Sequence, residues 1–246
     1  MSSPQVYFIG AGPGDPELLT LKAVKYLKRA DIVFYDYLVD ERVLEYASEK
    51  TELVSLGTPY TGHKKKQAEI NQLMIDAARS GKTVARLKGG DPHLFGRLNE
   101  ETAALRQAGI TYEVTAGVTS ASGAAQVAGF SLTDRVNASA VAFITGHLSH
   151  KHDPALPVLD YGRFATFPGT LVFYMGVSTA DIWSGALLHG GMPEDTPVIF
   201  VQNATLPNER VVYSALGRAG ETVETQKLES PCIVIVQPQA DTNGKG

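Results

Sequence analysis

The chain has 246 residues, of which 43% are apolar and 20% are charged, with 24 glycines and 13 prolines. This composition is typical of a folded α/β protein and excludes a disordered or fibrous one. The formal net charge of −4 argues against a broad nucleic-acid-binding surface, so we expect no nucleic-acid partner.

Neither a leader nor a membrane span is predicted. The N-terminus lacks a basic region followed by a long apolar stretch, and no apolar run approaches the roughly 20 residues that span a bilayer. The single cysteine, Cys232, cannot form an internal disulfide, and the run CIVIVQP around it indicates a buried strand thiol. We therefore expect a soluble cytoplasmic protein with no membrane partner.

Short β-rich runs alternate with helical patterns along the chain. The predicted strands are, in order, QVYFIG, DIVFYD, TVARL, YEVT, AVAFIT, TLVFYM, PVIFVQ and CIVIV. Between them, residues 17–30, residues 67–80 and a segment beginning near Asn99 have the apolar spacing of helices. This alternation favours βαβ units and mostly parallel sheets.

The first helix should begin directly after the GAGPG turn. Asp15 can cap its N-terminus, and Pro16 suits its first position. Four apolar residues recur in it at near-helical spacing, namely Leu18, Leu21, Val24 and Leu27.

From about residue 116 the pattern changes to the small-residue segment AGVTSASGAAQVAG, which permits close backbone packing or close approach of a ligand. We place a domain junction here. Residues 1–116 would form an N-terminal α/β domain with the GAGPGD and GGDP turns. Residues 117–246 would form a C-terminal α/β domain that completes a cofactor site. Residues 148–169 show little periodicity and should form a long surface segment.

The GAGPGD turn follows a strand and precedes a helix, which is also how a dinucleotide-binding fold begins, with Asp36 at the end of the next strand. Two details disfavour that interpretation. Asp15 occupies the position of the third glycine and would repel a phosphate, and Pro13 lacks the backbone N–H that would bind a pyrophosphate. A cofactor without phosphate suits this turn better, and the GGDP turn again offers open backbone beside a carboxylate.

Six short motifs occur in the order GAGPGD, GGDPHLFGR, VTSASGAA, TGH, FYMG and QNAT. With them the chain resembles the tetrapyrrole methylase family, and within it the branch that methylates uroporphyrinogen III, from about Val6 to Val236. The resemblance implies two α/β domains with the active site in the cleft between them. It also implies S-adenosylmethionine as the methyl donor, released as S-adenosylhomocysteine, and a homodimer.

The implied reaction is two successive methyl transfers to pyrrole carbons of uroporphyrinogen III. They give precorrin-2 by way of precorrin-1, for sirohaem or cobalamin synthesis. Methyl transfer from a sulfonium needs in-line approach and no metal, so the protein would act by positioning, by excluding water and by taking up the released proton.

The resemblance also assigns roles to individual positions. Its cofactor contacts match Pro13, Gly89, Gly90, Asp91, Leu94, Thr119, Ser120, Met175 and Ala204. Asp36 matches the catalytic proton acceptor, at the strand end where an open α/β sheet exposes its chemistry. Arg97 is assigned to catalysis and, with Glu100 and Arg135, to substrate binding, because guanidinium groups bind the carboxylates in which the implied substrate is rich.

Three departures from the family pattern bear on the substrate. Residues 57–59 read Gly-Thr-Pro where the family usually has Gly-Lys-Arg, so Thr58 replaces the lysine regarded there as a proton donor. Residues 116–117 read Ala-Gly in place of Pro-Gly, and residues 98–99 read Leu-Asn in place of a glycine pair. These changes leave open a methyltransferase for a later precorrin, or a non-catalytic homologue that binds S-adenosylmethionine or a tetrapyrrole.

Two clusters suggest other functions. His63 and the lysines at 64–66 form a positive stretch that either steers a polyanion or is simply solvated. His147, His150 and His152 lie close enough in sequence to share a metal ion. Because the resemblance places the TGH motif without a metal, we expect no metal site.

Overall fold

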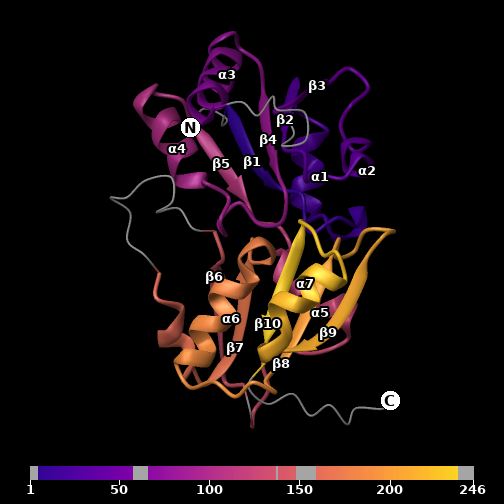
Figure 1. The fold of residues 1–246 in the computed structure, drawn as a ribbon. Coiled ribbons are helices and arrows are strands. Elements are labelled where there is room, and N and C mark those ends of the chain that lie inside the picture. The colour runs from indigo at the N-terminus through magenta and orange to yellow at the C-terminus, as the bar shows by residue number, and fades with distance from the viewer. Residues whose placement is uncertain (1–4, 58–65, 137, 148–158, 238–246) are drawn as a thin grey trace. The chain divides into compact units, whose positions relative to one another are not determined.

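The computed structural model describes residues 5–57, 66–136, 138–147 and 159–237. Contacts divide the chain into two compact units, Met1–Gly123 and Ala124–Gly246, each built on a five-stranded sheet (Figure 1). The predicted α/β class with two α/β units is confirmed. The division falls within a helix, α5 (Ser120–Ala128), and the domain junction expected after residue 116 stays a prediction.

The sheet of the first unit is parallel at every pairing in the described ranges. Its order is β3-β2-β4-β1-β5. The strands are β1 (Val6–Gly10), β2 (Ile32–Tyr35), β3 (Glu52–Ser55), β4 (Val84–Lys88) and β5 (Tyr112–Thr115). β4 lies between β1 and β2, so that Arg86 is opposite Phe8 on one side and Phe34 on the other. A dinucleotide-binding fold places its first two strands side by side, so this order argues against that topology.

Helices cover both faces of this sheet. They are α1 (Leu21–Leu27), α2 (Glu41–Leu44), α3 (Gln67–Arg79) and α4 (Leu98–Gln107). Residues of α3 and α4 share one apolar cluster with Phe8 and Phe34, whereas residues of α1 and α2 share another with Ile9 and Leu87. Because successive side chains of a strand point to opposite faces, the sheet is the middle of three layers.

The first helix differs from the prediction. A 3-10 turn over Pro16–Leu18 is capped by Asp15 as expected, but the chain is then extended at Leu19. The α-helix begins only at Leu21, with Thr20 as its N-cap. Leu21 is 91% exposed whereas Leu27 is fully buried, so the apolar residues at near-helical spacing do not share one buried face.

The sheet of the second unit is mixed, which departs from the mostly parallel prediction. Its order is β6-β7-β10-β8-β9. The strands are β6 (Ala140–Thr145), β7 (Gly169–Tyr174), β8 (Pro197–Gln202), β9 (Arg210–Ala215) and β10 (Cys232–Val236). β6 and β7 pair in parallel, whereas β10 is antiparallel to β7 and β8, and β9 is antiparallel to β8. The short connection over residues 203–209 lets the chain turn back without a crossover helix.

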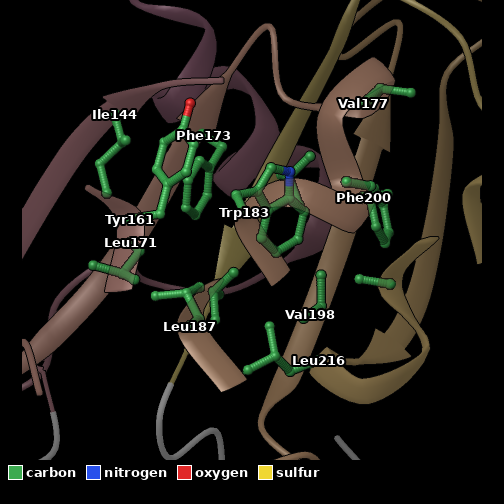
Figure 2. Close-up of a cluster of buried hydrophobic side chains, with 14 of the residues drawn as sticks. Ile144, Tyr161, Leu171, Phe173, Val177, Trp183, Leu187, Val198, Phe200 and Leu216 are labelled. Atoms are coloured by element: carbon green, nitrogen blue, oxygen red, sulfur yellow. The ribbon is translucent and has the colours of Figure 1, made fainter. Parts of the chain in front are cut away.

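Two helices, α6 (Ala180–His189) and α7 (Ala219–Thr225), contribute to the apolar core of this unit. Trp183 is fully buried there, stacked on Phe173 with ring centroids 4.7 Å apart. Its indole N–H donates to the Gly176 carbonyl at 2.8 Å. Figure 2 shows this indole among the aliphatic and aromatic side chains of the cluster. Burial of so much apolar surface, with the indole N–H satisfied, makes the cluster a main source of stability.

The other predicted elements had mixed outcomes. The helices expected over residues 67–80 and near Asn99 are confirmed as α3 and α4, whereas β3, β9 and helices α2, α5, α6 and α7 were not predicted. Short 3-10 turns complete the described elements, at η4 (Tyr161–Phe164), η5 (Val177–Thr179) and η6 (Leu216–Arg218). Within the described ranges, no helix combines the length and apolar character that crossing a membrane requires.

Candidate functional site

The GAGPGD and GGDP turns lie side by side, after β1 and β4. The Gly90 N–H donates to the Gly12 carbonyl at 2.7 Å, and the Gly12 N–H donates to the Gly90 carbonyl at 3.2 Å. The Ala11 N–H also donates to the Lys88 carbonyl at 2.8 Å. Backbone hydrogen bonds therefore hold the two turns together.

The segment after β5 joins these turns. A Cβ on Gly117 would lie 2.3 Å from the Gly90 carbonyl oxygen, and a Cβ on Gly10 would lie 2.5 Å from the Gly117 nitrogen. Only glycine permits so close an approach. A Cβ on Gly90 would lie 3.3 Å from the hydroxyl oxygen of Ser120, at the start of α5. The structure thus brings together three segments that the sequence singled out separately.

All the cofactor positions predicted in the first unit fall in or beside these segments. They are Pro13, Gly89, Gly90, Asp91, Leu94, Thr119 and Ser120, and each is at least partly buried. The Leu94 N–H donates to the Asp91 carbonyl at 3.1 Å, which closes the turn after GGD.

The three segments are rich in acceptors. Residues 10–15, 89–94 and 115–121 contain two carboxylates, Asp15 and Asp91, and no lysine or arginine. Asp91 Oδ1 accepts a hydrogen bond from the His93 backbone N–H at 2.8 Å and lies 2.7 Å from its ring Nδ1. Such a set suits a ligand with cationic and hydroxyl groups and disfavours a phosphate.

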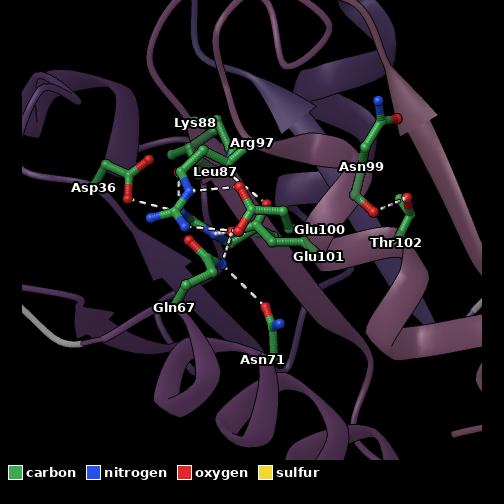
Figure 3. Close-up of polar contacts among 11 residues, drawn as sticks. Asp36, Gln67, Asn71, Leu87, Lys88, Arg97, Asn99, Glu100, Glu101 and Thr102 are labelled. Atoms are coloured by element: carbon green, nitrogen blue, oxygen red, sulfur yellow. Dashed lines mark hydrogen bonds and ion pairs between the residues drawn. The ribbon is translucent and has the colours of Figure 1, made fainter. Parts of the chain in front are cut away.

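Asp36 follows β2 and belongs to a buried ion-pair network (Figure 3). Its side chain is 31% exposed, and its Oδ1 accepts from Arg86 Nη2 at 2.7 Å. Arg86 Nε donates to one oxygen of Glu101 at 3.0 Å, and Lys88 Nζ donates to the other at 2.7 Å. This network was not predicted from the sequence. Its signal was the pair of cations in the strand run VARLK, since buried charges need partners.

Burial and neighbouring charges shift the pKa values of the two cations. Burial has the largest effect on Lys88 and, with the Arg86 guanidinium, lowers the pKa of Lys88 against the attraction of Glu101. Burial alone would also lower the pKa of Arg86, but the carboxylates of Asp36 and Glu101 outweigh it and raise that pKa. Arg86 therefore stays charged, whereas Lys88 loses its proton more readily than an ordinary lysine.

Arg97 and Glu100, the predicted substrate contacts, bind each other. Arg97 is the N-cap residue of α4, with a left-handed φ of 53°. Its Nε and Nη2 donate to the two carboxylate oxygens of Glu100 at 2.8 and 2.6 Å, and about half of each side chain is exposed. The hydrogen bond from Arg97 lowers the pKa of Glu100. A substrate carboxylate would have to share this guanidinium with Glu100 or displace it.

The other predicted site residues belong to the second unit. Met175 follows β7 with a φ of 56° and is 46% exposed. Ala204 follows β8 and is buried between Asn203 and Thr205, which also have positive φ angles. β7 and β8 both run antiparallel to β10 and so point in the same direction. Met175 and Ala204 therefore follow the carboxyl ends of two strands at the same end of this sheet. Positive φ angles at residues other than glycine, as at Met175, Asn203 and Thr205, are often found at functional sites. Arg135, also of the second unit, is exposed.

Some predicted features lie outside the described residues, namely Thr58, Pro59, His63, Lys64, Lys65, His150 and His152. Lys66 precedes α3 as its N-cap residue, and His147 is exposed after β6. Within the described ranges, no three His, Cys, Asp or Glu side chains are grouped so that they could hold a metal ion.

Residues 5–220 match the family model of the tetrapyrrole (corrin/porphyrin) methylases. The chain belongs to this family. Curated relatives of this tetrapyrrole methylase include the siroheme synthases of Hydrogenovibrio crunogenus, 41% identical over 233 residues, and Chromobacterium violaceum, 43% identical over 231 residues. Each match covers 94% of this chain and 48% of the relative, so the chain spans about half the length of the curated relatives it matches.

Solved structures confirm the tetrapyrrole methylase fold. The uroporphyrin-III C-methyl transferase of Thermus thermophilus, complexed with S-adenyl homocysteine, matches with a TM-score of 0.81 and 41% identity, over 95% of this chain and 97% of that one. A cobalt precorrin-4 methyltransferase matches with a TM-score of 0.83 and 27% identity, over 94% of each chain.

Proposed function

We propose that this tetrapyrrole methylase transfers two methyl groups from S-adenosylmethionine to pyrrole carbons of uroporphyrinogen III, giving precorrin-2 by way of precorrin-1. The observation that carries the proposal is the 41% identity to the Thermus thermophilus uroporphyrin-III C-methyl transferase over nearly the whole of both chains. The identity to the cobalt precorrin-4 methyltransferase is lower, at 27%. The siroheme synthases, of which the match covers about half, support a product used in sirohaem synthesis.

The methyl donor would bind at the three converging segments of the first unit. Their open backbone, the carboxylate of Asp91 and the lack of lysine or arginine fit its sulfonium, ammonium and hydroxyl groups. The proposed donor contacts are Pro13, Gly89, Gly90, Asp91, Leu94, Thr119 and Ser120, with Met175 and Ala204 added from the family resemblance. When bound, S-adenosylmethionine supplies an electrophilic methyl group on sulfur.

Asp36 is the proposed proton acceptor. A carbon–carbon bond forms as the carbon–sulfur bond breaks, and the methylated macrocycle then loses a proton. Within the described ranges Asp36 Oδ2 has no hydrogen-bonding partner, and its side chain is 31% exposed, so this oxygen is available as a base. Arg97, Glu100 and Arg135 would hold the substrate, with the guanidinium groups binding its carboxylates. Arg97 would thereby also serve catalysis, by orienting the macrocycle.

Anaerobic incubation with uroporphyrinogen III and S-adenosylmethionine tests this function. We expect the product mass to rise by one and then two methyl groups, with S-adenosylhomocysteine released at each step. Methylation of a later precorrin instead would favour the second candidate, which the TM-score of 0.83 to the cobalt precorrin-4 methyltransferase supports. Tight donor binding without methylation of any precursor would indicate a binding homologue.

We also propose that the chain acts as a homodimer in the cytoplasm, with no nucleic-acid or membrane partner. The net charge of −4 supports the lack of a nucleic-acid partner. Size-exclusion chromatography with light scattering should give the mass of two chains, and the mass of a single chain would contradict the dimer.

A further inference from the structure

The first unit buries a group of charges beside the proposed proton acceptor. Only 2%, 5% and 0% of the side chains of Arg86, Lys88 and Glu101 are exposed. Gln67 of α3 adds its amide, whose nitrogen donates to Glu101 at 3.2 Å. Figure 3 shows Gln67, Lys88 and Glu101 gathered beside Asp36. Strand β4, helices α3 and α4 and the residue after β2 therefore contribute to one polar cluster.

Such a network is a poor source of stability. Removing each ion from water costs several kcal/mol, and apolar residues of similar volume at the same positions often stabilise a fold as well or better. The surrounding face of the sheet is apolar, with Phe8 and Phe34 flanking Arg86 on the neighbouring strands. The network is therefore better explained by its contact with the Asp36 carboxylate than by a contribution to the stability of the fold.

The guanidinium of Arg86 has an acceptor at each of its nitrogens. Nε donates to Glu101 at 3.0 Å, Nη1 to the Leu87 carbonyl at 3.1 Å, and Nη2 to Asp36 Oδ1 at 2.7 Å. Lys88 Nζ holds the second oxygen of Glu101 at 2.7 Å. Because the guanidinium is a rigid plane, fixing Nε and Nη1 also fixes the direction of Nη2. The buried residues therefore determine how Arg86 meets Asp36.

Asp36 is the charged member of this network with most access to solvent, since 31% of its side chain is exposed and the others have at most 5%. Within the described ranges its side chain has one hydrogen-bonding partner, Arg86, which binds Oδ1. One carboxylate oxygen is thus fixed while the other can accept a proton.

We propose that Arg86 is a positioning residue for Asp36, and that Glu101 and Lys88 hold Arg86 in place. This inference rests on the proposed function, in which Asp36 accepts the proton released after methyl transfer. In that step a bond to hydrogen breaks in the methylated macrocycle, its electron pair stays in the macrocycle, and the proton goes to Asp36 Oδ2. Arginine keeps its charge throughout, so Arg86 orients the carboxylate without competing for the proton.

A double-mutant cycle on turnover separates this role from a purely structural one. Arg86→Lys keeps a buried cation but replaces the planar fork with an ammonium that cannot hold both carboxylates in the same geometry. We expect kcat to fall about 100-fold, with little change in the KM for uroporphyrinogen III. In an Asp36→Asn background, Arg86→Lys should lower kcat no further, because positioning acts only through Asp36.

Two further measurements control for folding. The affinity for S-adenosylhomocysteine, measured by calorimetry, should be the same in Arg86→Lys and the wild type. Arg163→Lys changes an exposed arginine of the second unit, paired with Asp160 at 3.2 Å, and should keep the wild-type kcat. If Arg86→Lys does not fold, Glu101→Gln gives a second cycle, because it keeps the shape of the buried acid and weakens its hold on Arg86. Its effect on kcat should likewise vanish in the Asp36→Asn background.

The possible results distinguish this inference from the proposed function. If the wild type does not methylate uroporphyrinogen III, the proposed function fails, and the positioning role falls with it. If the wild type is active but the two substitutions multiply their effects on kcat, the positioning role alone is overturned. The same conclusion follows if Arg86→Lys raises KM and leaves kcat unchanged.

Discussion

The two units bury different kinds of side chain. In the described ranges, the buried charged residues all belong to the first unit and are Arg86, Lys88 and Glu101. The buried polar side chains of the second unit are uncharged, and its core is an apolar cluster around Trp183. The first unit thus adds buried charges beside Asp36 to its two apolar clusters, whereas the core of the second unit is apolar. Substitutions in the two units should therefore change different properties.

The largest expected effect lies on the charged side of this comparison. Asp36→Asn keeps the shape of the side chain but removes its basic oxygen, so kcat should fall about 100- to 10,000-fold. The thermal midpoint should stay close to that of the wild type, because the asparagine oxygen can still accept the hydrogen bond from the buried Arg86. Asp160→Asn, which changes a more exposed aspartate in a similar ion pair, is the matched control for steady-state kinetics. A wild-type kcat in Asp36→Asn would contradict its role as the proton acceptor.

On the apolar side, Trp183→Ala should lower the free energy of unfolding by about 3–5 kcal/mol, because it leaves a cavity beside Phe173. Trp183→Phe keeps a ring but removes the indole donor of the Gly176 carbonyl, which still accepts from Thr179, and should cost about 1 kcal/mol. Both free energies are measured by denaturant unfolding followed by circular dichroism. Tryptophan fluorescence cannot be used, because both substitutions remove the single tryptophan of the chain. If both variants unfolded like the wild type, this cluster would not be a main source of stability.

A smaller effect is expected at the converging segments. Asp91→Ala removes a carboxylate proposed to attract the donor's positive charge, and should weaken S-adenosylhomocysteine binding about 10- to 100-fold. Asp91→Asn keeps an acceptor for the His93 N–H and isolates the effect of the charge. Calorimetric titration measures the Kd of each variant. S-adenosylhomocysteine keeps the donor's ammonium group but not its sulfonium charge, so an unchanged Kd in Asp91→Ala would place the ammonium group elsewhere.

A pH-dependent effect on stability is expected in the second unit. Burial raises the pKa of the Cys232 thiol from 9.0 to about 12. The folded state then keeps the thiol proton at a pH where the unfolded chain loses it, so this contribution to stability is complete below pH 9 and is lost between pH 9 and 12. The loss is about 1.4 kcal/mol per pH unit. The free energy of unfolding of Cys232→Ala should therefore decrease less steeply above pH 9, and equal slopes would contradict this assignment.

The sequence was sufficient to predict elements whose burial is uniform. β1, β4 and β10 are buried at every residue and were all predicted as strands. β1 and β10 are continuous apolar runs, whereas β4 carries Arg86 and Lys88. β3 and β9 are edge strands with exposed or partly exposed residues, so they lack that signal. The small residues of α5 have no apolar periodicity that would distinguish a helix from a loop. The late start of α1 depends on extended backbone at Leu19, which the capping residues alone did not reveal.

The candidate site was predictable in part for a similar reason. Glycine-rich turns after strands marked the segments that the structure brings together at Gly10, Gly90 and Gly117. The link from Asp36 through Arg86 to Glu101 was missed, because it joins residues 50 and 15 positions apart in the sequence. Only the pairing of β2 with β4 and the packing of α4 bring these charges together.

A crystal structure of the chain with S-adenosylhomocysteine tests most directly whether the converging segments hold the methyl donor. We predict that the nucleoside contacts the backbone of Gly89–Asp91 and the residues Thr119 and Ser120. Density for the nucleoside at any other place, with these segments packed only against each other, would contradict the account.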